Sequence, residues 1–129
     1  MACTTWGPKT FADQIAECKL NIESIFGTRI AKMTENATSQ EIASWDKQEA
    51  EARAWLADNS APTLMIDILL LNRGLTETKA ELVDKIILKA DTYLAFYAEN
   101  LGTLQRGIRR ADAATTKAEL DALAFWKEI

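Results

Sequence analysis

An all-α fold is predicted by the sequence: a small helical bundle of about five helices, with a long N-terminal helix and a long fourth helix. Only two prolines and five glycines interrupt the 129 residues, so few positions break a helix. Apolar residues recur at three- and four-residue spacing along nearly the whole chain, which is the period of an amphipathic helix. No stretch alternates apolar and polar residues as a half-buried strand does.

The first helix is expected to begin at Thr10, whose hydroxyl can cap free backbone amides, with Asp13 in the favourable first turn. Its apolar residues form one stripe that rotates slightly after Gly27: Phe11, Ile15, Cys18, Ile22, Ile25, Phe26, Ile30 and Met33. Such a stripe packs against the rest of the chain or pairs with other copies. Both interpretations stay open, because fewer than four heptads without consistent charged flanks do not define a coiled coil.

The second helix is expected to follow a turn at residues 36–39 and to end at about Ala57. Thr38 and Glu41 have the spacing of a capping box, in which each side chain satisfies a free amide at the helix start. The stripe of this helix is Ile42, Trp45, Glu49, Ala52 and Leu56, with Trp55 beside it. Glu49 interrupts the apolar residues, and we expect it to reach solvent or to pair with a basic residue.

The clearest loop covers residues 58–63, because Pro62 prevents a helix from continuing there. Thr63 is then expected to cap a short third helix over residues 64–73. Apolar residues cover most of the circumference of this helix, which predicts that it is the buried centre of the domain. Gly74 supplies the left-handed residue that ends it.

Two further helices are expected to start at the same pentapeptide, Thr-Lys-Ala-Glu-Leu, at residues 78–82 and 116–120. The first of these is the long fourth helix. Its apolar stripe is broad, which implies contacts on more than one side: Leu82, Val83, Ile86, Ile87, Ala90, Tyr93, Leu94, Phe96, Tyr97, Leu101, Leu104 and Ile108. Gly102 and Gly107 favour a bend or a close helix approach in its later half.

The composition is that of one soluble globular domain, with 48% hydrophobic and 26% charged residues. A net charge of -4 provides no overall attraction to nucleic acid or to an anionic membrane, so neither is an expected partner. The longest apolar run, residues 64–71, is broken by Asp67 and is too short to cross a bilayer. Cys3 and Cys18 are too few for a disulfide framework and fit a reduced, intracellular setting without a secretory signal.

The residue types argue against an enzyme. The chain contains no histidine, which removes the commonest general base and the commonest transition-metal ligand. Two cysteines alone cannot form a zinc site, and the scattered glycines form no nucleotide-binding loop. We therefore expect no catalytic residue, no metal and no cofactor.

Four tryptophans are many for a chain of this size. Trp45 and Trp55 are expected in the core. Trp6 and Trp126 lie near the termini and are candidate anchors for a partner protein, because tryptophan is enriched among interface hot spots. Packing of both side chains against the domain is the competing interpretation.

Several short motifs between Ile42 and Leu120 follow one another at spacings that resemble a known family. They are Trp45 to Ala50, Ala61 to Thr63, Asp67, Arg73 with Gly74, Thr78 to Leu82, Lys85, Lys89 with Ala90, and Asp112 to Thr116. These motifs resemble the helical C-terminal module of bacteriophage tail-fibre proteins and tail-fibre assembly (chaperone) proteins. They are caps, turns and alanine-rich faces, which specify a fold better than a task.

The resemblance implies a non-enzymatic protein that binds a trimeric phage tail fibre, or the baseplate, and assists folding or attachment. It implies a location in the host cytoplasm during assembly, or in the virion tail if the protein stays on the particle. A small structural component of the tail and a phage regulatory adaptor are the alternatives.

Relatives in that family usually carry a β-rich fibre-binding part before the module, whereas residues 10–33 of this chain are expected to be helical. The chain is therefore divided into residues 1–37, an N-terminal segment with an amphipathic helix, and residues 38–129, the module. The N-terminal helix is the leading candidate for partner binding or self-association. The expected partner-binding residues are Trp6, Phe11, Ile15, Ile22, Phe26 and Trp126.

Overall fold

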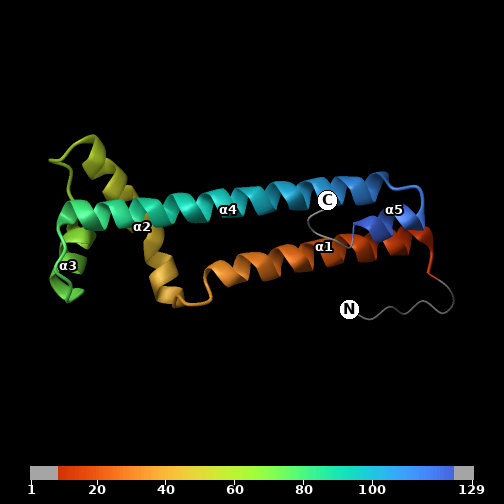
Figure 1. Cartoon of the computed structure of the whole chain (residues 1–129), viewed down its shortest axis with the longest axis horizontal. Helices are drawn as coiled ribbons and strands as arrows, with labels where there is room; N and C mark the ends of the chain where they lie inside the picture. The colour runs from red at the N-terminus through yellow and green to blue at the C-terminus, as the bar shows by residue number, and fades with distance from the viewer. Residues whose placement is uncertain (1–8, 124–129) are drawn as a thin grey trace. The chain divides into compact units, whose positions relative to one another are not determined.

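The structure of this chain, a computed structural model, describes residues 9–123. Five helices follow one another in this part: α1 (Phe11–Met33), α2 (Ser39–Ala57), α3 (Leu64–Asn72), α4 (Lys79–Ala113) and α5 (Lys117–Ala122) (Figure 1). None of the residues from 9 to 123 forms a β-strand. The all-α prediction is confirmed, and the long helices are α1 with 23 residues and α4 with 35 residues.

Contacts between residues divide the chain into two compact units that do not follow chain order. The first unit combines residues up to 32 with residues from 97 onward, and the second unit consists of residues 33–96. Of the described helices, the first unit contains α1, the later part of α4 and α5. The second unit contains α2, α3 and the earlier part of α4. The division of the sequence into residues 1–37 and 38–129 stays a prediction.

Four of the five described helices begin with a hydrogen bond between a threonine and the residue three positions later, as the capping motifs predict. The Thr10 hydroxyl accepts the Asp13 amide at 3.1 Å, and the Asp13 carboxylate accepts the Thr10 amide at 3.1 Å. Thr78 and Glu81 make the same exchange at the start of α4, at 3.2 and 3.0 Å. Each exchange satisfies two amides that the helix itself cannot pair. Hydroxyls also cap the remaining two of these helices: Thr38 for α2 and Thr116 for α5.

The core of the first unit lies where α1, the end of α4 and α5 pack together. Its buried residues are Ile22, Ala111, Ala114, Leu120 and Leu123, and the partly buried residues around them are Phe11, Ile15, Cys18, Leu104 and Ile108. Phe26 continues this side of α1 with an edge-to-face contact to Tyr97, at a ring-centroid distance of 5.8 Å. Five residues of the apolar stripe of the N-terminal helix, Phe11, Ile15, Cys18, Ile22 and Phe26, therefore pack against side chains of the same chain.

The core of the second unit is formed by α2, α3 and the start of α4. Its buried residues are Ala52, Ile66, Leu82 and Val83, surrounded by Trp55, Leu69, Leu70, Ile86 and Ile87. Arg53 links two of these helices, because its guanidinium contacts Glu49 at 2.8 Å and Asp91 of α4 at 2.6 Å. Glu49 thus pairs with a basic residue while its side chain stays 37% exposed, so the structure shows both of the expected outcomes.

The prediction that the third helix is the buried centre of the domain is wrong. Ile66 is fully buried, but Leu64, Ile68 and Leu71 are 70%, 51% and 84% exposed. Within the second unit, the described neighbours of α3 are α2 and α4, and they cover one side of a helix whose apolar residues surround it. Apolar residues all around a helix show that every side of it could be buried, but they do not show how many neighbouring helices it has.

The start of α3 also differs from the prediction, because Thr63 makes no side-chain hydrogen bond to the helix amides. Its hydroxyl donates to the Asp67 carboxylate at 3.1 Å instead. The free amides are taken by Glu51 of α2, whose carboxylate accepts from Met65 N at 3.2 Å and from Ile66 N at 3.0 Å. Glu51 is 6% exposed, and its charge faces the positive end of the α3 dipole. This buried carboxylate joins α2 to α3.

Replacing Glu51 by alanine is expected to lower the free energy of unfolding by about 1–3 kcal/mol, because two amides at a buried helix start lose their acceptor. Glu51→Gln keeps one acceptor oxygen and should lose less. The matched control is Glu49→Ala, which removes an i,i+4 ion pair worth about 0.2–0.5 kcal/mol. Urea denaturation of the three variants measures these differences, and equal losses at positions 49 and 51 would contradict the capping role.

Candidate protein-interaction surface

Three large apolar side chains of α3 lie on the solvent side of the second unit: Leu64, Ile68 and Leu71. Their spacing of four and three residues places them on one side of the helix, and we call this set the α3 face. Leu75, just beyond the end of α3, is 55% exposed as well. Single exposed leucines are normal on a folded protein, but grouped ones mark sites of interaction. The α3 face is therefore the candidate site.

The orientation of the α3 face follows from the opposite side of the helix. Ile66, Leu69 and Leu70 are packed into the core of the second unit. Every residue of α3 other than Asp67 and Asn72 is large and apolar, so burying one side leaves the other side apolar and exposed. Covering a fully exposed leucine contributes about 1.5–3 kcal/mol, so a partner that covers this face gains several such increments.

Charge on α3 is compensated locally. Asp67, the charged residue of this helix, contacts Lys79 at 2.9 Å, and this hydrogen bond holds the pKa of the Asp67 carboxyl below its usual value. Lys79 also lies over the Trp55 ring, with 5.7 Å between its Nζ and the ring centroid. The α3 face thus has no uncompensated charge from its own helix, which suits an apolar partner surface.

The segment that follows α3 is fixed by Glu77. Its side chain is 3% exposed and accepts from Lys85 at 2.7 Å and from Arg73 at 2.5 Å. The hydrogen bond from Lys85, followed by that from Arg73, holds the pKa of the Glu77 carboxyl below its ordinary value of 4.5. Gly74 has a φ of 70°, as predicted for the residue that ends the helix, and lets the chain turn there. Together these residues set the end of α3 and the path to α4.

Glu77 makes the stability of the chain depend on pH at the acidic end. A carboxyl whose folded-state pKa is lowered contributes stability that is present above its ordinary value of 4.5 and is lost as pH falls through the lower folded value. We expect Glu77→Gln to be less stable than the native chain at neutral pH, with the difference shrinking as pH falls below 4.5. Urea titrations at a series of pH values test this, and a difference that stays constant with pH would refute it.

The α1 residues that were expected to bind a partner pack against other residues of the first unit. Ile22 is 1% exposed in the core of the first unit, with Phe11 and Ile15 packed against it. Phe26 is half-buried against Tyr97. A substitution at Ile22 therefore reports on folding before it reports on binding. Trp6 and Trp126 lie outside the described residues.

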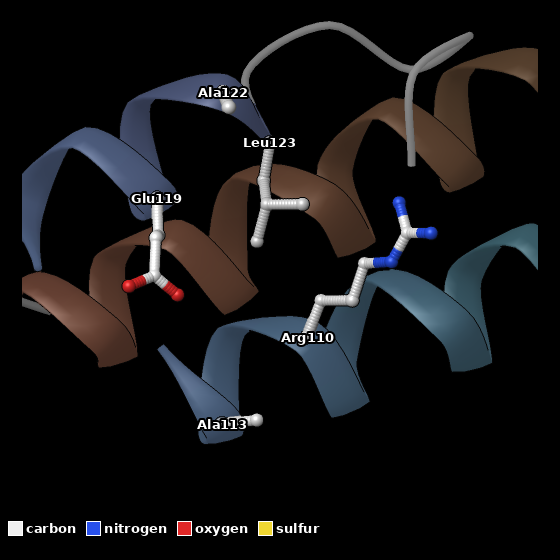
Figure 2. A pocket seen from close by; sticks show the side chains of 5 residues that line it. All are labelled: Arg110, Ala113, Glu119, Ala122 and Leu123. Atoms are coloured by element: carbon white, nitrogen blue, oxygen red, sulfur yellow. The ribbon is translucent and has the colours of Figure 1, made fainter. Parts of the chain in front are cut away.

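A hollow of about 430 Å³ lies in the first unit between the end of α4 and α5 (Figure 2). Arg110 and Ala113 line it from α4, and Glu119, Ala122 and Leu123 line it from the other side. Figure 2 shows the Leu123 side chain pointing into the space between the two helices. Arg110 already has an interaction partner. Among the described residues that line the hollow, Arg110 and Glu119 carry the charged groups, and we assign it no ligand.

Other kinds of site find little support between residues 9 and 123. No three Cys, Asp or Glu side chains of this part are grouped to hold a metal ion. Burial and the nearby Asp121 carboxylate raise the pKa of the Cys18 thiol, which keeps it in its less reactive protonated form. None of the described helices is long and apolar enough to cross a membrane.

Comparisons of this chain with protein families, with curated proteins and with solved structures gave no match.

The α3 face was not among the residues that the sequence suggested for partner binding. The available signal was that a nine-residue helix consists almost wholly of large apolar residues between two segments of ordinary amphipathic character. Such a helix either lies in the centre of a larger bundle or presents one side to a partner. In this chain the described neighbours cover one side of α3, and Leu64, Ile68 and Leu71 stay exposed on the other.

Proposed function

We propose that this chain is a non-enzymatic accessory protein of a phage tail, which binds the tail-fibre protein and assists its assembly. The observation that carries the proposal is the exposed α3 face. It lies within residues 42–120, the part of the sequence whose motifs resemble the helical module of tail-fibre assembly proteins. Binding through an apolar helix face requires no catalytic group, no metal and no cofactor.

The chemistry of the α3 face suits this role. An apolar helix side can dock into a groove of another protein through side chains spaced three and four residues apart. Leu64 and Leu71 are the most exposed of these side chains and are the expected anchors. Because Glu51 and Ile66 hold the opposite side of α3 in place, the face is presented in one orientation and little ordering cost accompanies binding.

The test is co-expression with the tail-fibre protein encoded in the same phage genome, followed by size-exclusion chromatography of the soluble fraction. The native chain should raise the yield of soluble fibre and co-elute with it. The double variant Leu64→Glu with Leu71→Glu should lose both effects while retaining its circular-dichroism spectrum. The matched control is Leu94→Glu in α4, because Leu94 is 61% exposed and lies outside the α3 face.

Each outcome decides the proposal. Equal activity of the native chain and the double variant would remove the α3 face as the contact. Failure of the native chain to affect or bind the fibre would overturn the tail-fibre role itself. Mass spectrometry of purified particles then distinguishes an assembly factor, which leaves, from a structural component, which stays in the virion.

A further inference from the structure

A second surface in the second unit is a groove between α2 and α4, separate from the α3 face. Its volume is about 290 Å³, and its main lining residues are Met33, Trp45, Lys85, Leu88, Lys89 and Tyr93. All of them belong to the same compact unit. The volume is at the lower limit of small-molecule sites, and it is enough for one large side chain rather than for a whole cofactor.

The floor of the groove is aromatic and fixed. Trp45 of α2 and Tyr93 of α4 meet edge to face, with ring centroids 5.9 Å apart and an interplanar angle of 69°. Both rings are half-buried, so part of each is open to the groove. Leu88 is 69% exposed at the edge. Tryptophan and tyrosine that are held rigidly and left partly open give large contact area at little entropic cost.

Two lysines stand at the rim of the groove, and each contacts one glutamate. Lys85 and Lys89 lie one turn apart on α4, and their side chains are 58% and 57% exposed. The Lys89 ammonium lies 4.4 Å from the centroid of the Trp45 ring. Lys89 is also 3.5 Å from Glu41, and Lys85 is 2.7 Å from Glu77. The Lys89–Glu41 pair is exposed at both ends and contributes about 0–1 kcal/mol, so Lys89 can share its protons with a further carboxylate at little cost. Lys85 is 58% exposed, and its ammonium has protons beyond the one it donates to the nearly buried Glu77.

We propose that this groove binds a short acidic segment of a partner protein, with one aromatic or leucine side chain of that segment inserted between Trp45 and Leu88. The apolar floor fits the inserted side chain, and the two lysines fit carboxylates on either side of it. Charge complementarity selects this occupant over a basic segment, which would meet two ammonium groups at the rim. The inference stands on the groove alone and does not depend on the tail-fibre assignment.

The experiment uses the full chain and a set of fluorescein-labelled synthetic peptides. Each peptide has one central tryptophan or alanine, flanked on both sides by glutamate, glutamine or lysine, and binding is followed by fluorescence anisotropy. The tryptophan peptide with glutamate flanks should bind most tightly, and its affinity should fall with added salt. Replacing the central tryptophan by alanine, or glutamate by lysine, should each weaken binding by at least about tenfold.

Two variants locate the binding in the groove. Leu88→Glu should weaken binding of the acidic tryptophan peptide by at least about tenfold, because it removes apolar contact and repels the peptide. Leu94→Glu is the matched control on the same helix, with a similar exposure of 61%, and should bind as the native chain does. Lys85→Gln with Lys89→Gln should abolish the preference for glutamate over glutamine flanks while the tryptophan preference remains.

The proposal is overturned if the acidic tryptophan peptide does not bind, or if Leu88→Glu and Leu94→Glu weaken binding equally. It is also overturned if sedimentation shows that the native chain self-associates and that Leu88→Glu alone abolishes this, since the occupant is then a second copy. A preference for glutamate that survives the double lysine variant would refute the role of the rim.

Discussion

Replacing Ile22 by alanine is expected to lower the free energy of unfolding by about 2–5 kcal/mol, as for other large side chains removed from a packed core. Ile22 is 1% exposed and lies between α4 and α5 residues such as Ala111 and Leu120. Those small and medium side chains are fixed by their own helices, so the lost volume is not refilled. Urea denaturation followed by far-ultraviolet circular dichroism measures the loss.

The matched control on the same helix is Leu20→Ala, because Leu20 is 57% exposed. It is expected to change the free energy of unfolding by less than about 0.5 kcal/mol. This pair also decides the role of the N-terminal helix. If Ile22→Ala left stability unchanged and weakened only the binding of a partner, α1 would be an interaction helix, as the sequence alone suggested, and the core assignment would fail.

The second large effect is expected within α3. Ile66→Ala should lower the free energy of unfolding by about 2–5 kcal/mol, because Ile66 is fully buried between α2 and α4. Leu71→Ala removes a side chain of the same size from the same helix, yet Leu71 is 84% exposed and should lose less than about 0.5 kcal/mol.

A comparison of Ile66→Ala with Leu71→Ala tests which side of α3 faces the core. Both variants keep the helical propensity of alanine, so the difference between them reports burial rather than helix formation. A large loss at Leu71 with a small loss at Ile66 would mean that the helix faces the other way. The α3 face would then be part of the core and could not bind the fibre.

The helices themselves could be predicted from the sequence because their signals are local. A threonine followed three residues later by an acidic residue caps its own helix in α1, α2, α4 and α5, with no contribution from the rest of the chain. The breadth of the apolar stripe of α4 likewise predicts neighbours on more than one side. Gly74 adopts the left-handed conformation that its position demanded.

What could not be predicted depends on contacts distant in sequence. Glu51 and Ile66 are fifteen residues apart in the chain, so no local pattern connects the carboxylate to the amide that it caps. The stripe through Ile22 was visible, but the sequence alone does not say whether α5 or another molecule covers it. For α3 the spacing of the apolar residues does not predict which side is buried, because apolar residues occur on all sides of the helix.

The exposed α3 face also has a consequence for how the protein behaves at high concentration. Leucines on the solvent side of one copy can meet those of another, and such patches promote non-specific clustering and precipitation. The net charge of -4 opposes this only through modest long-range repulsion, which physiological salt screens beyond about 8 Å. We therefore expect the chain to be more soluble during synthesis when its partner is produced at the same time and covers the α3 face.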